Sequence, residues 1–333
     1  MKMWKCTVFI PVLSAALLFV SHPAWAQEEQ IVNLFAPTLG NLKTRTSYAI
    51  KSYDGQEVEG QATDFRSTRH RVRIMTPLYQ TDRDELSCAA SLEYQDIDTD
   101  ARLPDTNESF PDNLWGINIG ATFRHLLDDD KIIGGYFACG SRSDKPFDST
   151  HETTIGTTLF VRIPSGDTDS WLWSVNYSNN REFLNNIPLP GVAYQYARSK
   201  RITAIIGVPF ALVWYRPTDA SSVFLGYYLV RTVHAKARYR MTDAFSCFAG
   251  FDWDNERYLR SGRSDRKHRL FYYEKRVNVG VAFDIMQDFK IEIAGGYAFD
   301  RFYFEGTTYS DRSQNRLDIH DGPYASINAQ LSF

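Results

Sequence analysis

Charged side chains stand at every second position in several stretches of this chain, and their chemistry is suited to attracting solutes or joining strands. Arg69, Arg71 and Arg73 are separated by His70 and Val72. Because successive side chains of a β-strand point to opposite faces, the three arginines share one face. Alternation places further charged residues on the same kind of polar face: Arg124, Arg162, Lys236, Arg238, Asp252, Asp254, Glu274, Arg276 and Glu292.

Two interpretations of this charged set remain open. Opposite charges on neighbouring strands pair and stabilise a sheet. A turn at 241–244 should place His234, Lys236 and Arg238 beside the strand that carries Asp252 and Asp254. In the other interpretation, the charges line a water-filled path and select the solutes that pass. We expect the arginine row at 69–73 to be the best candidate for a strip that attracts anions.

The composition excludes several classes of protein. The 333 residues are 43% hydrophobic and 14% aromatic with a net charge of −3, which is unlike a disordered chain. A helical membrane bundle needs several apolar runs of about 20 residues, and the sequence has none beyond its N-terminus. The small net charge predicts no nucleic-acid partner. Cys88, Cys139 and Cys247 lack the spacing of metal ligands, so we expect neither a metal nor a cofactor.

The N-terminus has the pattern of an export signal. Lys2 and Lys5 precede an uncharged apolar run at 8–20, and Ala24-Trp25-Ala26 resembles a cleavage site. An N-terminal membrane anchor is the alternative, but the run is short. We therefore expect a signal peptide at 1–26, a short periplasmic segment at 27–41 and one folded domain at 42–333.

Apolar and polar residues alternate along most of that domain. In the last stretch Ile327, Ala329, Leu331 and Phe333 are apolar, and the residues between them are polar. Strict alternation predicts strands with one apolar face and one wet face. A soluble β-sandwich buries the apolar faces in a core, whereas a transmembrane β-barrel turns them toward lipid.

Three features favour the barrel. The predicted strands are about 9–15 residues long, which suits a tilted bilayer crossing. Aromatic residues gather near strand ends, as interfacial girdles require: Trp115, Trp171 with Trp173, Tyr272 with Tyr273, and Phe302 with Tyr303. The apolar ending at Ile327, Ala329, Leu331 and Phe333 is similar to the signal that the barrel-assembly machinery of Gram-negative bacteria reads.

The expected fold is therefore an all-β transmembrane antiparallel barrel of about 14–16 strands with both termini in the periplasm. The hexapeptide at 215–220 recurs in similar form at 239–244. If both are turns at the same end, the count is about 16. If 202–216 and 221–240 are single long strands, it is about 14.

From Trp171 onward the chain resembles an uncharacterised bacterial outer-membrane β-barrel family, a domain of unknown function. The matching stretches are Leu189-Pro190-Gly191-Val192-Ala193-Tyr194, Gly207-Val208-Pro209-Phe210, Tyr215-Arg216-Pro217-Thr218, Tyr273-Glu274-Lys275-Arg276-Val277, Gly295-Gly296-Tyr297-Ala298-Phe299-Asp300-Arg301 and Asp321-Gly322-Pro323-Tyr324. The resemblance covers about half of the chain and implies a barrel in the outer membrane. It supplies no substrate and no functional residue.

These observations predict a porin-like channel for small polar solutes in the outer membrane of a Gram-negative bacterium. A closed structural or surface-binding barrel that acts through its extracellular loops is the alternative. A lipid-modifying enzyme is a third hypothesis, which has little support because the histidines are scattered and His125 has no serine two residues later. The expected partners are outer-membrane lipid, lipopolysaccharide and the barrel-assembly machinery.

Overall fold

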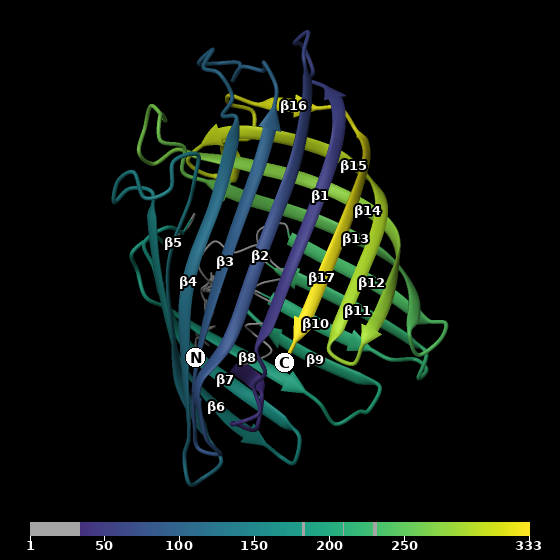
Figure 1. Ribbon diagram of the computed structural model, residues 1–333. Coiled ribbons are helices and arrows are strands. Elements are labelled where there is room, and N and C mark those ends of the chain that lie inside the picture. The colour runs from purple at the N-terminus through teal and green to yellow at the C-terminus, as the bar shows by residue number, and fades with distance from the viewer. Residues whose placement is uncertain (1–33, 182–183, 209, 229–231) are drawn as a thin grey trace, which may run out of the picture.

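Each long strand pairs with its neighbours in the chain, and the last one pairs with the first, so the sheet closes on itself (Figure 1). The computed structural model describes residues 34–181, 184–208, 210–228 and 232–333. The strands are β1 (Arg45–Glu57), β2 (Asp64–Gln80), β3 (Asp84–Asp98), β4 (Asn113–Leu126), β5 (Ile132–Ser143), β6 (Thr153–Ser165), β7 (Asp169–Ser178), β8 (Leu189–Tyr196), β9 (Ile202–Gly207), β10 (Phe210–Tyr215), β11 (Ser221–Tyr228), β12 (Thr232–Arg240), β13 (Phe245–Tyr258), β14 (Arg269–Met286), β15 (Phe289–Gly306), β16 (Leu317–Ile319) and β17 (Gly322–Ser332), with a 3₁₀ turn, η1, at Tyr309–Asp311.

Over these described residues the fold is a closed antiparallel barrel of 16 strands. β16 is an addition to this wall: it pairs with β15 and bridges Val58 at the end of β1, above β17. The region at 202–240 contains four short strands, β9 to β12, because each of the stretches 202–216 and 221–240 contains two strands and not one long strand. The prediction of 16 strands is confirmed, and the alternative of 14 is wrong.

The two ends of the barrel differ. The first and last strands of the wall begin and end side by side, with Arg45 opposite Ser332, at the end where the connections are short. We name this the terminal end, and Figure 1 shows the C label there. The opposite end, the loop end, carries the long connections 99–112, 144–152 and 259–268. This division matches the short turns and long loops of transmembrane barrels.

The outer face of the wall is apolar. Val277, Val279 and Ile293 are each close to half exposed or more on β14 and β15, and Val279 reaches 67%. Because the polar side chains alternate to the inside, this surface is suited to lipid. Within the described ranges, no helix is long and apolar enough to cross a membrane.

Aromatic side chains border the outer face at two levels. Tyr48, His70, Tyr94 and Trp115 form a row across β1 to β4, and the Tyr94 and Trp115 ring centroids are 4.4 Å apart. Nearer the terminal end, Trp171 contacts Tyr194 with centroids 4.7 Å apart. Such rows fit the interfaces of a bilayer.

Two predicted girdle pairs are placed differently by the structure. Tyr272 and Tyr303 stack with centroids 4.5 Å apart inside the barrel, so their assignment to a girdle is wrong. Their neighbours Tyr273 and Phe302 form a buried cluster with Tyr309 from the η1 turn. Sequence alternation predicted the strands that carry these residues, but it gave no indication that the loop after β15 packs on them.

The segment that precedes β1 packs inside the terminal end. Leu34 and Phe35 are buried against an apolar part of the inner wall. This part of the wall consists of Ile132, Phe160, Leu172, Ala193, Ile205, Phe210, Leu212 and Tyr228. The sequence predicts a short periplasmic segment at 27–41. Residues 34–41 of this segment are described, and Leu34 and Phe35 lie inside the barrel. Residues 1–33, which include the predicted signal peptide, lie outside the described residues.

Two adjacent glycines of β15 provide a test of the wall. A Cβ at Gly296 would lie 2.6 Å from the Tyr324 ring and even closer to the carbonyl oxygen of Val277, whereas a Cβ at Gly295 would meet nothing within 4 Å. Overpacking costs about 1–3 kcal/mol. We expect Gly296→Ala to reduce the fraction of folded protein, measured by heat-modifiable migration on a gel, and Gly295→Ala to leave it unchanged. Equal behaviour of the two variants would contradict the register of β15 and β17.

Candidate functional site: a charged network across the lumen

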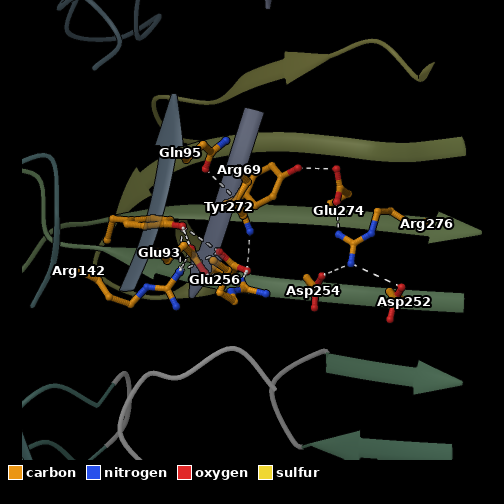
Figure 2. Close-up of polar contacts among 12 residues, drawn as sticks. Arg69, Glu93, Gln95, Arg142, Asp252, Asp254, Glu256, Tyr272, Glu274 and Arg276 are labelled. Atoms are coloured by element: carbon orange, nitrogen blue, oxygen red, sulfur yellow. Dashed lines mark hydrogen bonds and ion pairs between the residues drawn. The ribbon is translucent and has the colours of Figure 1, made fainter. Parts of the chain in front are cut away.

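Hydrogen bonds join strands that lie on opposite sides of the lumen near the loop end. Arg69 on β2 donates from Nη1 to Oε1 of Glu256 on β13 at 2.8 Å, and from Nη2 to Oε1 of Gln95 on β3 at 2.9 Å. Gln95 in turn donates to the hydroxyl of Tyr303 on β15 at 3.0 Å. β2 and β3 are not neighbours of β13 or β15 in the wall, so these bonds cross the interior. Figure 2 shows the network between the facing strands.

Two carboxylates form the centre of this cross-lumen network. Arg142 on β5 donates from Nη2 to Oε1 of Glu93 at 3.0 Å and to Oε2 of Glu256 at 2.9 Å. The Tyr258 hydroxyl lies 2.9 Å from each of the same two oxygens. Arg71 forms an ion pair with Glu93 on the neighbouring strand. Three guanidinium groups therefore surround two carboxylates, and all five side chains are nearly inaccessible to solvent.

A second group of charges continues the network toward β1. Glu274 on β14 accepts hydrogen bonds from Tyr53 at 2.6 Å and Arg301 at 3.1 Å, and forms an ion pair with Arg276. Arg276 Nη2 also lies 2.6 Å from Oδ2 of Asp254. Tyr53 belongs to β1, which is separated from β14 by β17 and β15, so this group also spans part of the interior. Figure 2 shows Glu274 and Arg276 beside Asp252 and Asp254.

The loop-end half of the lumen is closed by these contacts together with an apolar core. Phe65, Phe110 and Tyr303 pack with their ring centroids 4.8–5.6 Å apart. The backbone amide of Leu259 donates to the carbonyl oxygen of Arg142 at 2.7 Å, which joins β5 to the connection that follows β13. A buried charge is costly unless it is paired and hydrogen-bonded. The pairing accounts for how so many charges are accommodated where water is excluded.

The terminal half is more open. A cavity of about 260 Å³ is lined by Lys51, His234, Lys236, Asp252 and Glu292, among others. We name this space the inner cavity. A wider hollow of about 890 Å³, the basic mouth, lies nearer the terminal end, and its charged lining is Lys200, Arg201, Arg216, Asp219, Arg238 and Arg240. Lys236 and Arg238 alternate inward along β12, so the strand runs from one space to the other.

Predicted cross-strand pairing around the turn at 241–244 is confirmed in part. His234 lies opposite Asp252, and its Nδ1 is 2.7 Å from Oδ1 of that residue. Lys236 and Arg238 lie opposite Gly250 and Phe248 instead. Both reach Glu292 on β15, and Lys236 does so at 2.7 Å. The long side chains therefore reach past two intervening strands, β13 and β14, whereas the prediction considered only adjacent strands.

The remaining predicted residues have other partners. Arg124 forms an ion pair with Glu85 at 3.0 Å and donates to the carbonyl oxygen of Thr38 at 2.9 Å. Arg162 donates to the carbonyl oxygen of Phe35 at 3.1 Å. These two arginines thus hold the segment before β1. Arg73 lines a cavity of about 120 Å³ near Arg124. The role of the predicted strip as an anion attractor stays a prediction.

The predicted assembly signal lies at the end of β17. Ile327, Leu331 and Phe333 are among the exposed large hydrophobic residues, and Ala329 is half-buried. They occupy the outer face, since Ser326 and Asn328, which flank Ile327, line the inner cavity. Recognition of this ending by an assembly machinery stays a prediction.

Several members of the network were absent from the predicted set. Arg142 and Arg301 are central to it, yet the alternation around each was not strong enough to assign a face. Continued alternation from Glu292 along β15 would turn Asp300 inward, but its carboxylate lies 2.6 Å from Lys275 outside the lumen. The cause is an extra residue on β15, where Asp300 has a φ of 52° and shifts the alternation by one. Among the described residues, no group of three or more histidine, cysteine or acidic side chains is arranged to hold a metal ion.

No protein-family model matches the chain, so the resemblance to an uncharacterised family stays a prediction. No curated protein matches it either. Solved structures that match this chain in a structural comparison include an outer-membrane channel of Pseudomonas putida F1. It has 9% identity and a TM-score of 0.38, and the match covers 87% of this chain and 95% of that one. OccAB4 of Acinetobacter baumannii has 9% identity and a TM-score of 0.39 over 88% and 99% of the two chains. The translocator domain of the autotransporter NalP of Neisseria meningitidis has 12% identity and a TM-score of 0.32 over 93% and 94%.

The basic loop at 259–268 is tied to its neighbours. Arg260 donates from Nε to Glu305 at 2.8 Å and also pairs with Glu108. Arg263 donates from Nη1 to Oε1 of Glu152 at 2.8 Å. Burial raises the pKa of Glu152, but hydrogen bonds from Ser149 and Arg263 outweigh it and hold the pKa below its usual value. The pair is therefore complete at neutral pH and is lost as the pH falls through that lowered pKa.

Removing one carboxylate from the network should destabilise the barrel strongly. Breaking a buried ion pair costs about 3–5 kcal/mol because the remaining charge is left without a partner. We expect Glu256→Gln to lower the urea midpoint of unfolding in detergent, since Arg69 and Arg142 both lose the negative charge between them and one of the two acceptor oxygens becomes an NH₂ donor. The exposed pair of Lys275 and Asp300 supplies the control, and Asp300→Asn should cost about 0–1 kcal/mol. A Glu256→Gln midpoint equal to that of the control would show that the network contributes little to stability.

The loop contact can be tested by proteolysis. Glu152→Gln removes the charge that Arg263 binds, so the loop should open more often and trypsin should cleave after Arg266 or Lys267 about tenfold faster. Asp148→Asn changes an exposed carboxylate in the same connection as Glu152 and should have no effect. Cleavage rates that do not differ between the two variants would rule out a stabilising role of this pair.

Proposed function

We propose that this protein is an outer-membrane β-barrel that passes small polar solutes, and that the described conformation is its closed state. The apolar outer face and its aromatic rows support a position in a bilayer. Short turns and both ends of the wall lie at one end, which we assign to the periplasm, and the long loops face the exterior. The predicted signal peptide is consistent with export to this membrane.

The observation that carries the proposal is the polar space in the terminal half. The basic mouth and the inner cavity follow each other along β12 and end at the cross-lumen network. Side chains in this space retain partial exposure, for example 34% at Lys236 and 27% at Asp252. A barrel whose interior served only to hold the wall together would not need such a path. We therefore interpret it as a vestibule that leads to a closed gate.

Ion pairs are suited to act as this gate because each pair is either formed, which blocks the lumen, or broken, which opens it. Arg142 is shared between Glu93 on β3 and Glu256 on β13, so withdrawal of its side chain from the network would break two bonds together. Each carboxylate would then retain another arginine partner, Arg71 or Arg69. Arg142 can thus leave the network without leaving a buried carboxylate unpartnered.

Conductance across a planar bilayer tests the proposed function. We expect rare openings from the wild-type barrel and more frequent ones from Arg142→Met, which removes the arginine shared by Glu93 and Glu256. Lys275→Met alters an exposed cation outside the lumen and should behave as the wild type. Folding of each variant is checked by heat-modifiable migration. Silence of wild type and Arg142→Met, both properly folded, would contradict the channel.

A closed barrel that acts through its loops is the second candidate. It is favoured by the ion pairs that tie the connections at 99–112, 144–152 and 259–268 into one layer. The predicted alternative of a lipid-modifying enzyme receives no such support. His125 Nδ1 lies 2.7 Å from Asp84, and within the described residues no hydrogen bond joins this histidine to a serine.

A further inference from the structure

We propose that the inner cavity binds a small oxyanion, a carboxylate or phosphate group, with the ammonium group of Lys51 as its anchor. This inference deepens the proposed function, because it assigns a chemical class to the solute that enters the vestibule. It rests on the position of Lys51, on the donors around it and on the charge of the path that leads to it.

Lys51 faces the lumen from the middle of β1. It lies opposite Ser326 of β17 and Arg69 of β2, and Ser326 lines the same cavity. Its Nζ is 5.8 Å from the centroid of the Tyr324 ring. Within the described residues no carboxylate oxygen lies within ion-pair distance of this ammonium group, in contrast to Lys236, Arg276 and Arg69. A lysine in such a place is a compact positive charge that is available to a ligand.

The carboxylates of the cavity already have cationic partners. Asp252 lies 2.7 Å from His234 and 3.6 Å from Arg276. Glu292 is shared by Lys236 and Arg238. Neither acid is therefore directed at Lys51, and the lining retains an excess of positive charge.

Neutral and basic donors complete the cavity. Nε2 of His234 is buried without a hydrogen-bond partner in the described structure, with Oδ1 of Asp254 3.7 Å away, and this side chain is 9% exposed. Asn278, Tyr324, Ser326 and Asn328 also line the space. A volume of about 260 Å³ holds several water molecules of about 30 Å³ each. It therefore suits a small solute, and hydroxyl and amide groups beside a cation are the partners that an oxyanion requires.

The basic mouth would raise the local concentration of such a solute. Its lining contains Lys200, Arg201, Arg216 and Arg240 against the single carboxylate of Asp219. Arg240 donates to the backbone carbonyl of Asp219 at 2.7 Å. Because a carbonyl carries no net charge, this hydrogen bond does not neutralise the positive charge of Arg240. A concave surface of one sign concentrates ions of the opposite sign. Anions are thus directed from the periplasmic side along β12 toward Lys51.

Isothermal titration of the full chain in an uncharged detergent tests the site, with inorganic phosphate and acetate as separate probes. We expect one or both to bind, and Lys51→Met to weaken that binding about tenfold or more, since the anchoring charge is lost. Lys51→Arg keeps the charge and should retain binding. Lys275→Met removes a cation outside the lumen and serves as the matched control with wild-type affinity.

The outcomes separate this inference from the proposed function. Absence of binding of both probes to the wild type, or equal affinity of Lys51→Met and the wild type, would overturn the oxyanion site. Lys51→Gln, checked for heat-modifiable migration, replaces Lys51→Met if the latter does not fold. Because titration requires no transport, a barrel that binds an anion but stays silent in a bilayer would refute the channel and leave the site intact.

Discussion

The ion pair between Arg69 and Glu256 joins two sides of the barrel, and the arrangement of the loop-end half depends on contacts of this kind. A closed sheet of this size encloses an interior that side chains must fill or leave to water. Here long arginine side chains extend inward from β2 and β5 and meet carboxylates from β3 and β13. The aromatic core above them keeps water out, which strengthens each interaction and makes complete pairing necessary. The same ion pairs therefore close the lumen and neutralise the charges within it.

The fold was largely predictable because period-two alternation is a local property. The stretch at 277–285 alternates strictly, and its outer residues Val277 and Val279 are exposed as expected. The turns at 215–220 and 239–244 were also predicted, but the sequence left the strand number open between 14 and 16. The inner face of Arg69, Glu274 and Arg276 followed from the same rule.

The site itself was less predictable, since its contacts depend on the shape of the closed wall. Nothing near Arg69 in the sequence indicates Glu256 as a partner, because their strands are far apart both along the chain and around the sheet. The extra residue at Asp300 shifts the alternation, so Arg301 rather than Asp300 enters the lumen. Leu34 and Phe35 lie against apolar inner-wall residues, although the interior of such a barrel is ordinarily polar.

The pairing of β1 with β17 has a consequence for how the molecule is made. The two strands that close the sheet, β1 and β17, are the first and last strands of the wall. Their hydrogen-bonded ladder, from Arg45 and Ser332 to Tyr53 and Tyr324, can therefore form only when the last strand is present. Until then the growing sheet has two unpaired edges, each a template for association with another chain. Contacts between such distant residues are also slow to form. A barrel closed in this way must be kept apart from its copies until its last strand is in place.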